Sequence, residues 1–440
     1  MMLVTKKMNK YVDDALKVMF HNKIGNIEKN AFTRNRMLTF EDIIIMSIAR
    51  KGVTTAMELF DFYKKIEKNA VSKQDYSKQR MKILESYWTK TLADIAREYY
   101  EFCRVEKLGK YIVIAIDGSK TILPRCKELE EKYGLANANN SQQKCVQCTI
   151  SGCYDVLNNI MLNIQIAPYG ADERELAKEN IKAIKQSYPD MKFLIIFDRG
   201  YPSIDMLNFL DEMGIKYLIR LQNSTYEKEK RDMKSNDEIV RIKITKDRLT
   251  GKMSDETKIK LKEIKEYKTR FIKCKLSTGN TEWLATNLDT KKFPASQLQD
   301  LYFKRWKIET SYDTLKNKLQ IENISGKCDR IVRQDIYSTI IVYNMIETIS
   351  KMIEEEGKDK LNNENNKHEY KMNQNILIGA FKNLFIELVI TESPKKKKQL
   401  FELFYQYALK YKTAIIPNRT YPREFKNGST KCKINHKRAF

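Results

Sequence analysis

The stretch from Tyr302 to Lys316 combines side chains that could bind a metal ion beside phosphates. An α-helix turns about 100° per residue, so a helix here would project four polar residues from an arc of about 60° on one face. These residues are Tyr302, Arg305, Glu309 and Lys316. A carboxylate set among cations suits a divalent metal next to phosphates. The alternative is an ordinary amphipathic helix in which Arg305 and Glu309 pair at i,i+4.

Two further carboxylates follow apolar runs that are typical of buried strands. Residues 111–116 and 193–197 are short, fully apolar runs, and Asp117 and Asp198 come directly after them. Such runs predict central strands, and polar chemistry gathers at the carboxyl ends of strands in sheets covered by helices. If the two strands are parallel neighbours, the two aspartates come close together. A lone aspartate at a strand end is alternatively a helix cap or a turn former.

These residues together resemble a known family of enzymes. Asp117, Asp198 and Glu309 are similar to the D-D-E triad of cut-and-paste transposases. The spacing Tyr302-x2-Arg305-x3-Glu309-x6-Lys316 resembles the Y-R-E-K motif of the IS4 group, which includes the Tn5-like transposases. The resemblance extends to Trp306 after the arginine, to the Asp-Arg-Gly-Tyr around Asp198 and to Trp283 upstream of the helix, and it covers roughly residues 110 to 320.

The resemblance implies an RNase H-like catalytic domain that cleaves and joins DNA strands. Asp117, Asp198 and Glu309 are then the catalytic residues and the ligands of two Mg²⁺ ions, which Mn²⁺ could replace. Hard ions of this kind prefer carboxylate oxygens. The partners implied are the terminal inverted repeats of the element and target DNA, with a homodimer in the synaptic complex. A hairpin intermediate is implied by the Y-R-E-K resemblance alone.

Five residues near the triad are expected to contact DNA. Arg305 offers a bidentate fork to a phosphate, Lys316 a point charge, and Tyr302 a hydroxyl. In the related transposases, tryptophans placed as Trp283 and Trp306 receive a flipped base, and base–aromatic stacking contributes about 1–3 kcal/mol. Ordinary core packing is the alternative for either tryptophan.

Composition indicates a polyanionic partner. The 440 residues include 81 Lys and Arg against 57 Asp and Glu, a formal net charge of +24. Neutralisation of phosphates by Lys and Arg supplies most non-specific affinity for nucleic acids. A genome that over-uses Lys, Asn and Ile would inflate the lysine count without any such partner. No apolar stretch approaches the length that spans a bilayer, and the amino terminus lacks the apolar segment of a signal peptide. We therefore expect a cytoplasmic, nucleoid-associated prokaryotic protein without membrane contacts.

The scarcity of histidine excludes several other enzyme classes. The chain has 3 histidines, His21, His368 and His436, widely separated in the sequence. Nucleases of the HNH type need more, and a Ser-His-Asp triad is implausible with these positions. The alternatives that stay open are a hydrolytic RNase H-like nuclease, which would share the triad without joining strands, and a non-catalytic, domesticated DNA-binding protein.

The sequence predicts an α/β fold in three regions. Residues 1–106 are expected to form a helical, DNA-binding domain, in which Ser72 caps a recognition helix. Its candidate DNA contacts are Lys73, Lys78, Arg80 and Lys82. A small helical bundle whose lysines simply face water is the alternative.

Residues 107–330 are expected to form the RNase H-like domain, in the order β-β-β-α-β-α-β. A β-rich subdomain at about 223–285 would interrupt it, because stretches there alternate apolar residues with lysine. Residues 331–440 are expected to form carboxy-terminal helices and a basic tail for contacts with DNA or a second subunit. The sequence of the inverted repeats, the target preference and the terminal region that recognises the ends are not predictable from the chain.

Overall fold

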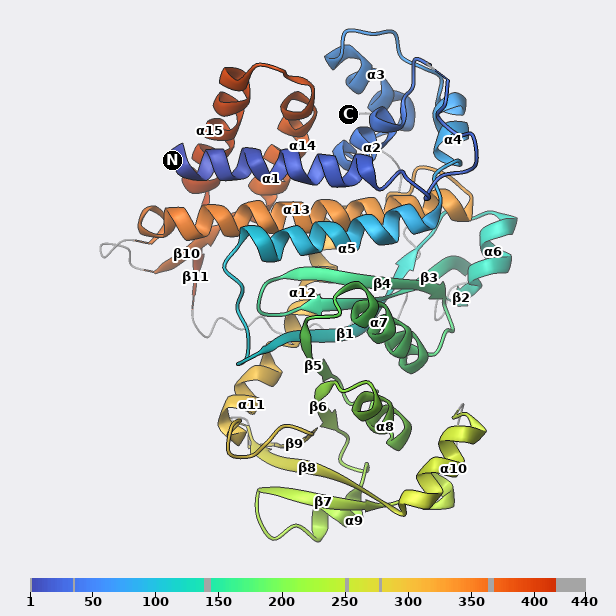
Figure 1. The fold of residues 1–440 in the computed structure, drawn as a ribbon, viewed down its shortest axis with the longest axis vertical. Coiled ribbons are helices and arrows are strands. Elements are labelled where there is room, and N and C mark those ends of the chain that lie inside the picture. Colours follow the sequence, from blue (N-terminus) through green and yellow to red (C-terminus); the bar gives the residue numbers. More distant parts are fainter. Residues whose placement is uncertain are drawn as a thin grey trace.

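The protein is a mixed α/β molecule with one large sheet and a layer of long helices (Figure 1). The computed structural model describes residues 2–34, 36–137, 144–249, 253–276, 279–362 and 368–416. The basic tail expected after residue 418 lies outside these ranges. None of the helices in the described ranges is long and apolar enough to cross a membrane.

Within the described ranges, nine strands form the central sheet, and its middle contains the runs predicted from the sequence. The strands are β1 (Tyr111–Ile122), β2 (Leu135–Asn137), β3 (Lys144–Asp155), β4 (Ile160–Pro168), β5 (Lys192–Phe197), β6 (Lys216–Leu221), β7 (Asp237–Lys243), β8 (Glu266–Lys275) and β9 (Thr281–Thr286). Their order is β2-β3-β1-β5-β6-β9-β8-β7, with β4 paired to β3. β1, β5 and β6 are parallel to one another, and the other pairings are antiparallel.

The strands of the expected insertion continue this sheet. β9 pairs with β6, β8 with β9 and β7 with β8, so the segment after residue 223 extends the same hydrogen-bonded ladder. Buried and exposed residues alternate in β7, as the lysine-rich pattern predicted. Short helices accompany these strands: α9 (Glu227–Arg231), η1 (Lys246–Arg248) and α10 (Asp255–Ile264).

Helices beside the sheet carry or support the polar residues of interest. They are α6 (Lys127–Tyr133), α7 (Glu173–Ser187), α8 (Ile204–Glu212), α11 (Ala295–Phe303), α12 (Trp306–Asp313) and the π-helix η2 (Thr314–Lys318). The single continuous helix expected over residues 302–316 is therefore wrong in detail. α11 ends at Phe303, α12 begins at Trp306, and a π-helical turn follows. An extra residue per turn in a π-helix changes the direction of the side chains that follow.

The amino-terminal and carboxy-terminal helices form a thick helical layer on one side of the sheet, in which some helices adjoin the sheet and others lie farther out (Figure 1). They are α1 (Met2–His21), α2 (Phe40–Ala49), α3 (Thr55–Lys65), α4 (Lys73–Arg80), α5 (Glu85–Phe102), α13 (Asp329–Leu361), α14 (Gln374–Ile390) and α15 (Pro394–Lys410). A small two-stranded sheet, β10 (Glu369–Met372) and β11 (Lys412–Ile415), lies beside them.

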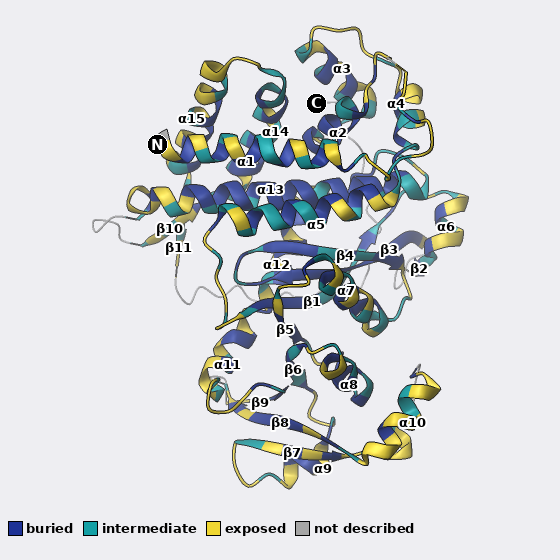
Figure 2. Ribbon diagram, in the orientation of Figure 1, coloured by how far each residue is buried: buried dark blue, intermediate teal, exposed yellow. Residues whose placement is uncertain are grey.

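Helix α13 joins this layer to the sheet. Most of its residues are buried, as Figure 2 shows, and they include polar ones such as Gln334, Asp335 and Asn344, because other elements enclose much of the helix. Asn344 on α13 satisfies both backbone groups of Met161 on β4, accepting from its N–H at 2.9 Å and donating to its carbonyl at 2.8 Å. The helical layer and the sheet therefore share one apolar core.

Candidate active site

Asp117 lies on β1, and Asp198 directly follows the adjacent parallel strand β5. The two strands pair in register from Tyr111 with Lys192 to Ala115 with Ile196, so the two aspartates follow at equivalent positions. β5 ends at Phe197, as expected. β1 does not end at Asp117, because it continues along β3, where Asp117 pairs with Gly152. Asp117 therefore lies within a strand, at the point where its parallel partner stops.

Helices α11 and α12 bring the Y-R-E-K residues to these aspartates. The Tyr302 hydroxyl donates to Asp198 Oδ1 at 3.2 Å. The Arg305 guanidinium donates from Nη2 to Glu309 Oε1 at 2.9 Å, and its Nη1 lies 3.9 Å from Asp117 Oδ2. Tyr302 and Arg305 are only 2% and 3% exposed. Arg305 thus occupies the space between two of the three predicted catalytic carboxylates.

Two hydrogen bonds fix α12 and η2 to strand β1. The Tyr312 hydroxyl donates to the Asp117 carbonyl at 2.8 Å. It reaches this position because Gly152 has no side chain: a Cβ there would lie 2.9 Å from the hydroxyl. The Lys316 ammonium donates to the Lys120 carbonyl at 2.6 Å. Burial lowers the pKa of Lys316. In this arrangement Lys316 anchors its helix to the strand, and its contact with a phosphate stays a prediction.

The site carries more negative charge than its one buried arginine balances. The pKa of Asp117 is raised to about 6, chiefly by burial. The hydrogen bond from the Gly118 N–H and the charge of Arg305 lower this pKa, whereas the charges of Glu309 and Glu173 raise it. Burial also raises the pKa of Tyr201 well above its ordinary value, and nearby Asp117 adds to the effect. Within the described residues, the buried Tyr201 hydroxyl has no hydrogen-bond partner. An unsatisfied hydroxyl beside partly neutralised carboxylates is the environment that a bound cation and its water would complete.

Glu173 is a fourth carboxylate at this site, and sequence reasoning missed it. It is the first residue of α7, and a Cβ added at Gly118 would lie 3.1 Å from its Oε1. Lys120 Nζ lies 3.6 Å from the same oxygen. In the sequence, an acidic residue after the N-cap Asp172 indicates only a helix start. The contact with Gly118 depends on how α7 packs against β1, which no local pattern reveals.

The donor set fits a hard divalent cation, although the carboxylates are not gathered around a common point. Asp117, Asp198 and Glu309 offer the carboxylate oxygens that Mg²⁺ prefers. In the described part of the chain, no group of three or more His, Cys, Asp or Glu side chains has the spacing of metal ligands. Arg305, which bridges Asp117 and Glu309, explains this spacing, because its guanidinium supplies the positive charge between them.

The two tryptophans lie in different surroundings. Trp306 is 38% exposed, and the Arg305 guanidinium lies over its ring, 4.8 Å from the centroid. Trp283 on β9 has the ammonium groups of Lys230 and Lys273 over its ring, at 5.4 and 5.5 Å. Neighbouring residues of a strand face opposite sides of the sheet. Glu282 interacts electrostatically with Asp198 and Arg305, so Trp283 faces away from the triad.

The residues expected to bind DNA on α4 divide into two groups. Ser72 caps this helix, as predicted, by accepting from the Asp75 N–H. Lys73 and Lys78 are exposed. Arg80 is 1% exposed and pairs with Asp335 at 2.6 Å, so its expected role as a DNA contact is corrected: its guanidinium is enclosed in the core.

Comparisons with known proteins agree with the resemblance to the IS4 group. The transposase InsG of insertion sequence element IS4 from Escherichia coli (strain K12) is 25% identical over 181 residues, which are 40% of this chain and 37% of that protein. The match thus spans little more than a third of that relative. The transposase of insertion sequence element IS1151 from Clostridium perfringens is 23% identical over 373 residues, 73% of this chain and 76% of that one.

A solved structure is similar over most of its length, but distantly. The piggyBac transposase in a synaptic complex with hairpin DNA covers 98% of this chain and 87% of its own, with a TM-score of 0.43 and 11% identity. So distant a likeness carries no argument about the site. The family model described as "Transposase DDE domain" matches residues 108–345, more than half of the chain. This chain therefore belongs to the transposase DDE domain family.

Proposed function

We propose that the chain is a DNA transposase that excises and inserts its own element by hydrolysis and transesterification of phosphodiester bonds. The observation that carries the proposal is the arrangement around Arg305. This arginine contacts Asp117 and Glu309, and Tyr302 from the same helical region contacts Asp198, within a chain of the transposase DDE family. Asp117 and Glu309, far apart in the sequence, thus share one buried cation, and Asp198 joins the same region through Tyr302.

We propose that residues 107–330 form an RNase H-like domain with the segment at about 223–285 inserted. The order of the strands supports it: β4, β3 and β1 are antiparallel, and β5 and β6 then follow β1 in parallel. Helices α7 and α8 make the connections to β5 and β6. In this arrangement the catalytic aspartates lie where β5 ends, as ligands do at the carboxyl ends of parallel strands.

We propose that Asp117, Asp198 and Glu309 hold two Mg²⁺ ions. When bound, such ions activate the attacking oxygen and stabilise the leaving oxygen of a displacement at phosphorus. The chain's own residues position these groups: Tyr302 orients Asp198, and Tyr312 fixes α12 against the carbonyl of Asp117. The Arg305 guanidinium, which lies beside Asp117 and Glu309, has the fork geometry that suits a bidentate contact with a backbone phosphate.

The two reactions balance without an external energy source. In hydrolysis, water attacks phosphorus and the bond to the 3′ oxygen breaks, so the phosphate stays on the 5′ end and the 3′ oxygen takes up a proton released by the water. In transesterification, the freed 3′ hydroxyl attacks another phosphate, so one phosphodiester bond forms as one breaks. Attack on the opposite strand gives a hairpin, which water reopens before the end joins target DNA.

The experiment incubates the purified chain with Mg²⁺ and DNA that carries the element ends, and separates the products on a gel. We expect cut, hairpin and joined species. Cutting without a hairpin would remove that step alone, and cutting without joining would favour the hydrolytic nuclease. Binding without cutting would favour the non-catalytic DNA-binding protein.

A matched pair of variants tests the assignment of Glu309. Glu309→Ala should abolish cleavage and leave DNA binding nearly intact. Glu131→Ala removes an exposed carboxylate from α6 and should leave both unchanged. Cleavage by Glu309→Ala at the normal rate would refute the assignment.

We further propose that the chain acts as a homodimer on paired ends, at the nucleoid of a prokaryotic cell. This proposal rests on the family alone. Sedimentation of the chain with end DNA tests it, because a complex of one chain with one end would contradict it.

A further inference from the structure

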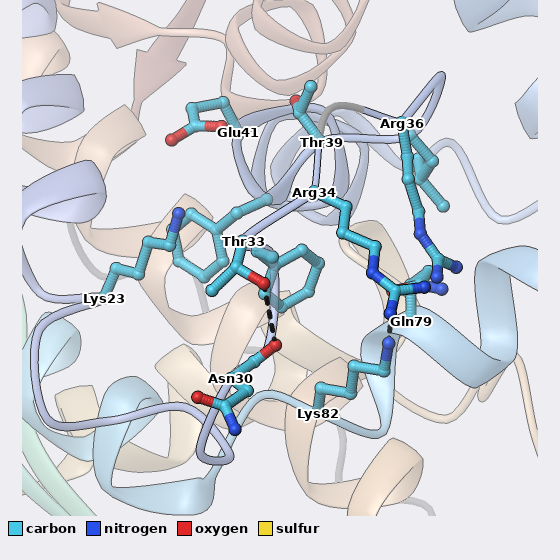
Figure 3. Close-up of a pocket in the computed structure, with 12 residues that line it drawn as sticks. Lys23, Asn30, Thr33, Arg34, Arg36, Thr39, Glu41, Gln79 and Lys82 are labelled. Carbon is cyan, nitrogen blue, oxygen red and sulfur yellow. Dashed lines mark hydrogen bonds between the residues drawn. The ribbon is translucent and has the colours of Figure 1, made fainter.

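A basic pocket lies between the α1–α2 loop, α2 and the end of α4 (Figure 3). Its volume is about 400 Å³, and four cationic side chains line it against the single carboxylate of Glu41. The four cations are Lys23, Arg34, Arg36 and Lys82. We call this site the basic pocket. In Figure 1 its elements lie across α13 and α5 from strand β1, so it is separate from the catalytic carboxylates.

The loop that carries the arginines is held in a defined position. The Glu28 N–H donates to the Lys82 carbonyl at 2.9 Å, and the Leu84 N–H donates to the Asn26 carbonyl at 3.1 Å. These bonds place the loop beside Lys82. Phe32 has a φ of +57°, a left-handed conformation that a bulky residue rarely adopts. A conformation of this kind persists only where the surrounding structure enforces it.

Aromatic rings hold two of the cations in the pocket. Lys23 Nζ lies 5.3 Å from the ring centroid of Phe40 and 5.8 Å from that of Phe32, and Lys82 Nζ lies 6.0 Å from the ring of Phe32. Lys82 also donates to Gln79 Oε1 at 2.9 Å. Both ammonium groups are therefore positioned before any ligand arrives.

The two arginines bring like charges together without an acidic partner. Arg34, Arg36 and Lys82 line the same pocket, and in Figure 3 their charged ends point toward the part of it near Gln79, whereas Glu41 points elsewhere. Across the described ranges, no carboxylate lies within ion-pair distance of Arg34 or Arg36. The neighbouring Glu28 is paired with Arg330 at 2.7 Å. Converging like charges repel one another, and an anion between them would relieve that repulsion.

We propose that the basic pocket binds a phosphate group of the DNA backbone, at a distance from the site of cleavage. Guanidinium forks match the geometry of phosphate oxygens, and the adjoining helix α4 extends the positive surface with the exposed Lys73 and Lys78. The inference rests on the proposed function for the identity of the DNA. It adds a contact that is built by the loop before α2, whereas the sequence pointed to α4 itself.

The experiment measures the affinity of the full chain for a fluorescein-labelled DNA duplex as a function of salt concentration. Arg34→Ala/Arg36→Ala removes two charges from the basic pocket. Lys6→Ala/Lys17→Ala is the matched control, because it removes two charges from exposed positions of α1. Arg34→Lys/Arg36→Lys keeps the charge and tests whether the fork geometry matters.

We expect the pocket variant to lower the slope of log K against log[salt] by about 1 for each phosphate that is no longer neutralised, with a roughly tenfold weaker affinity at low salt. The control should keep the wild-type slope, and the lysine variant should keep most of it. Equal slopes for the pocket variant and the control would overturn the proposal. A second result would also overturn it. This result is that inorganic phosphate stabilises the wild type against thermal unfolding while the DNA slope of the pocket variant stays at the wild-type value.

The outcome is distinguishable from a failure of the proposed function. In one outcome, the pocket variant lowers the slope of log K against log[salt], but the wild type neither cuts nor joins strands. This outcome supports the phosphate-binding pocket and contradicts the transposase activity. If the wild type cuts and joins while the pocket variant keeps its salt slope, the activity stands and the pocket fails. Circular dichroism of every variant confirms that each one is folded.

Discussion

Asp335 and Asp117 both have arginine neighbours, yet their electrostatic environments are opposite. Asp335 lies 2.7 Å from Arg50 and 2.6 Å from Arg80, and Ser325 donates to it from both its N–H and its hydroxyl. Burial alone would raise the pKa of Asp335, but the two arginines lower it to about 2. Asp117 has one guanidinium at 3.9 Å and a pKa raised to about 6.

The difference separates a saturated structural ion pair from a carboxylate whose charge its neighbours balance only in part. Around Asp335 the charges and hydrogen bonds are complete, so nothing further is needed to keep the carboxylate ionised. Around Asp117 they are incomplete, because its neighbours include Glu309 and Glu173. A buried carboxylate with too little positive charge nearby is a candidate for function, whereas a saturated one stabilises the fold.

Asp117→Asn should produce the largest effect on activity. Removal of this charge takes away a proposed metal ligand, so we expect the cleavage rate to fall by on the order of 10³-fold. The free energy of unfolding should change little, because Asp117 is not part of a saturated ion pair. Single-turnover cleavage and urea unfolding measure the two quantities. A large loss of stability with normal cleavage would show that Asp117 stabilises the fold and does not act in cleavage.

Asp335→Asn should lower the free energy of unfolding and leave the cleavage rate nearly unchanged. It leaves Arg80 and Arg50 enclosed without their anion, which costs about 3–5 kcal/mol when one partner of a buried pair is removed. Urea unfolding measures the loss. Where the variant is still folded, its cleavage rate should stay close to that of the wild type. An unchanged free energy of unfolding would show that the Arg80 pair does not stabilise the fold.

Mg²⁺ should stabilise the wild type against thermal unfolding. A ligand that binds only the folded state adds about 2.7 kcal/mol at a concentration 100 times its Kd. The increment should disappear in Asp117→Asn and persist in Asp335→Asn. Calorimetry with and without Mg²⁺ distinguishes the two, and equal increments in both variants would place the metal elsewhere.

The loss of stability at acidic pH should show how much the ionised Asp335 carboxylate stabilises the fold. Its pKa is about 2 in the folded chain, below the ordinary value for aspartate, so the unfolded chain takes up the proton first as the pH falls. Its contribution is therefore present above about pH 4 and is lost as the pH falls toward 2, an amount of about 2 kcal/mol. The urea midpoints of wild type and Asp335→Asn should converge over this interval. A constant difference between them would contradict the assignment.

Tyr201→Phe should have the smallest effect. The hydroxyl has no partner in the described part of the chain, so its loss should change the free energy of unfolding by less than about 0.5 kcal/mol. If the hydroxyl supports the metal site, the affinity for Mg²⁺ should fall by about 10-fold. Tyr63→Phe is the control, because that buried hydroxyl also lacks a partner and lies in α3. Equal Mg²⁺ affinity in wild type and Tyr201→Phe would exclude this role.

The sequence predicted the parts of the site that depend on local patterns. Apolar runs indicated the strands before Asp117 and Asp198, and helical spacing placed Arg305 beside Glu309. Both patterns follow from the periodicity of the backbone.

What the sequence missed depends on tertiary packing. The approach of Glu173 to Gly118 and the enclosure of Arg80 by α13 join segments far apart in the chain. The π-helical turn at residues 314–318 has no compositional signal, and the α-helical geometry assumed for Lys316 does not apply there. The continuation of β1 beyond Asp117 follows from its pairing with β3, which an isolated run of residues does not show.

Helix α13 sets a fixed spacing between helix α4 and strand β4. It carries Asp335, which holds α4, and Asn344, which holds β4, and about 13 Å of helix separates them at a rise of 1.5 Å per residue. Because an α-helix does not stretch, adding or removing one turn between these two anchors would displace α4 by about 5.4 Å relative to β4.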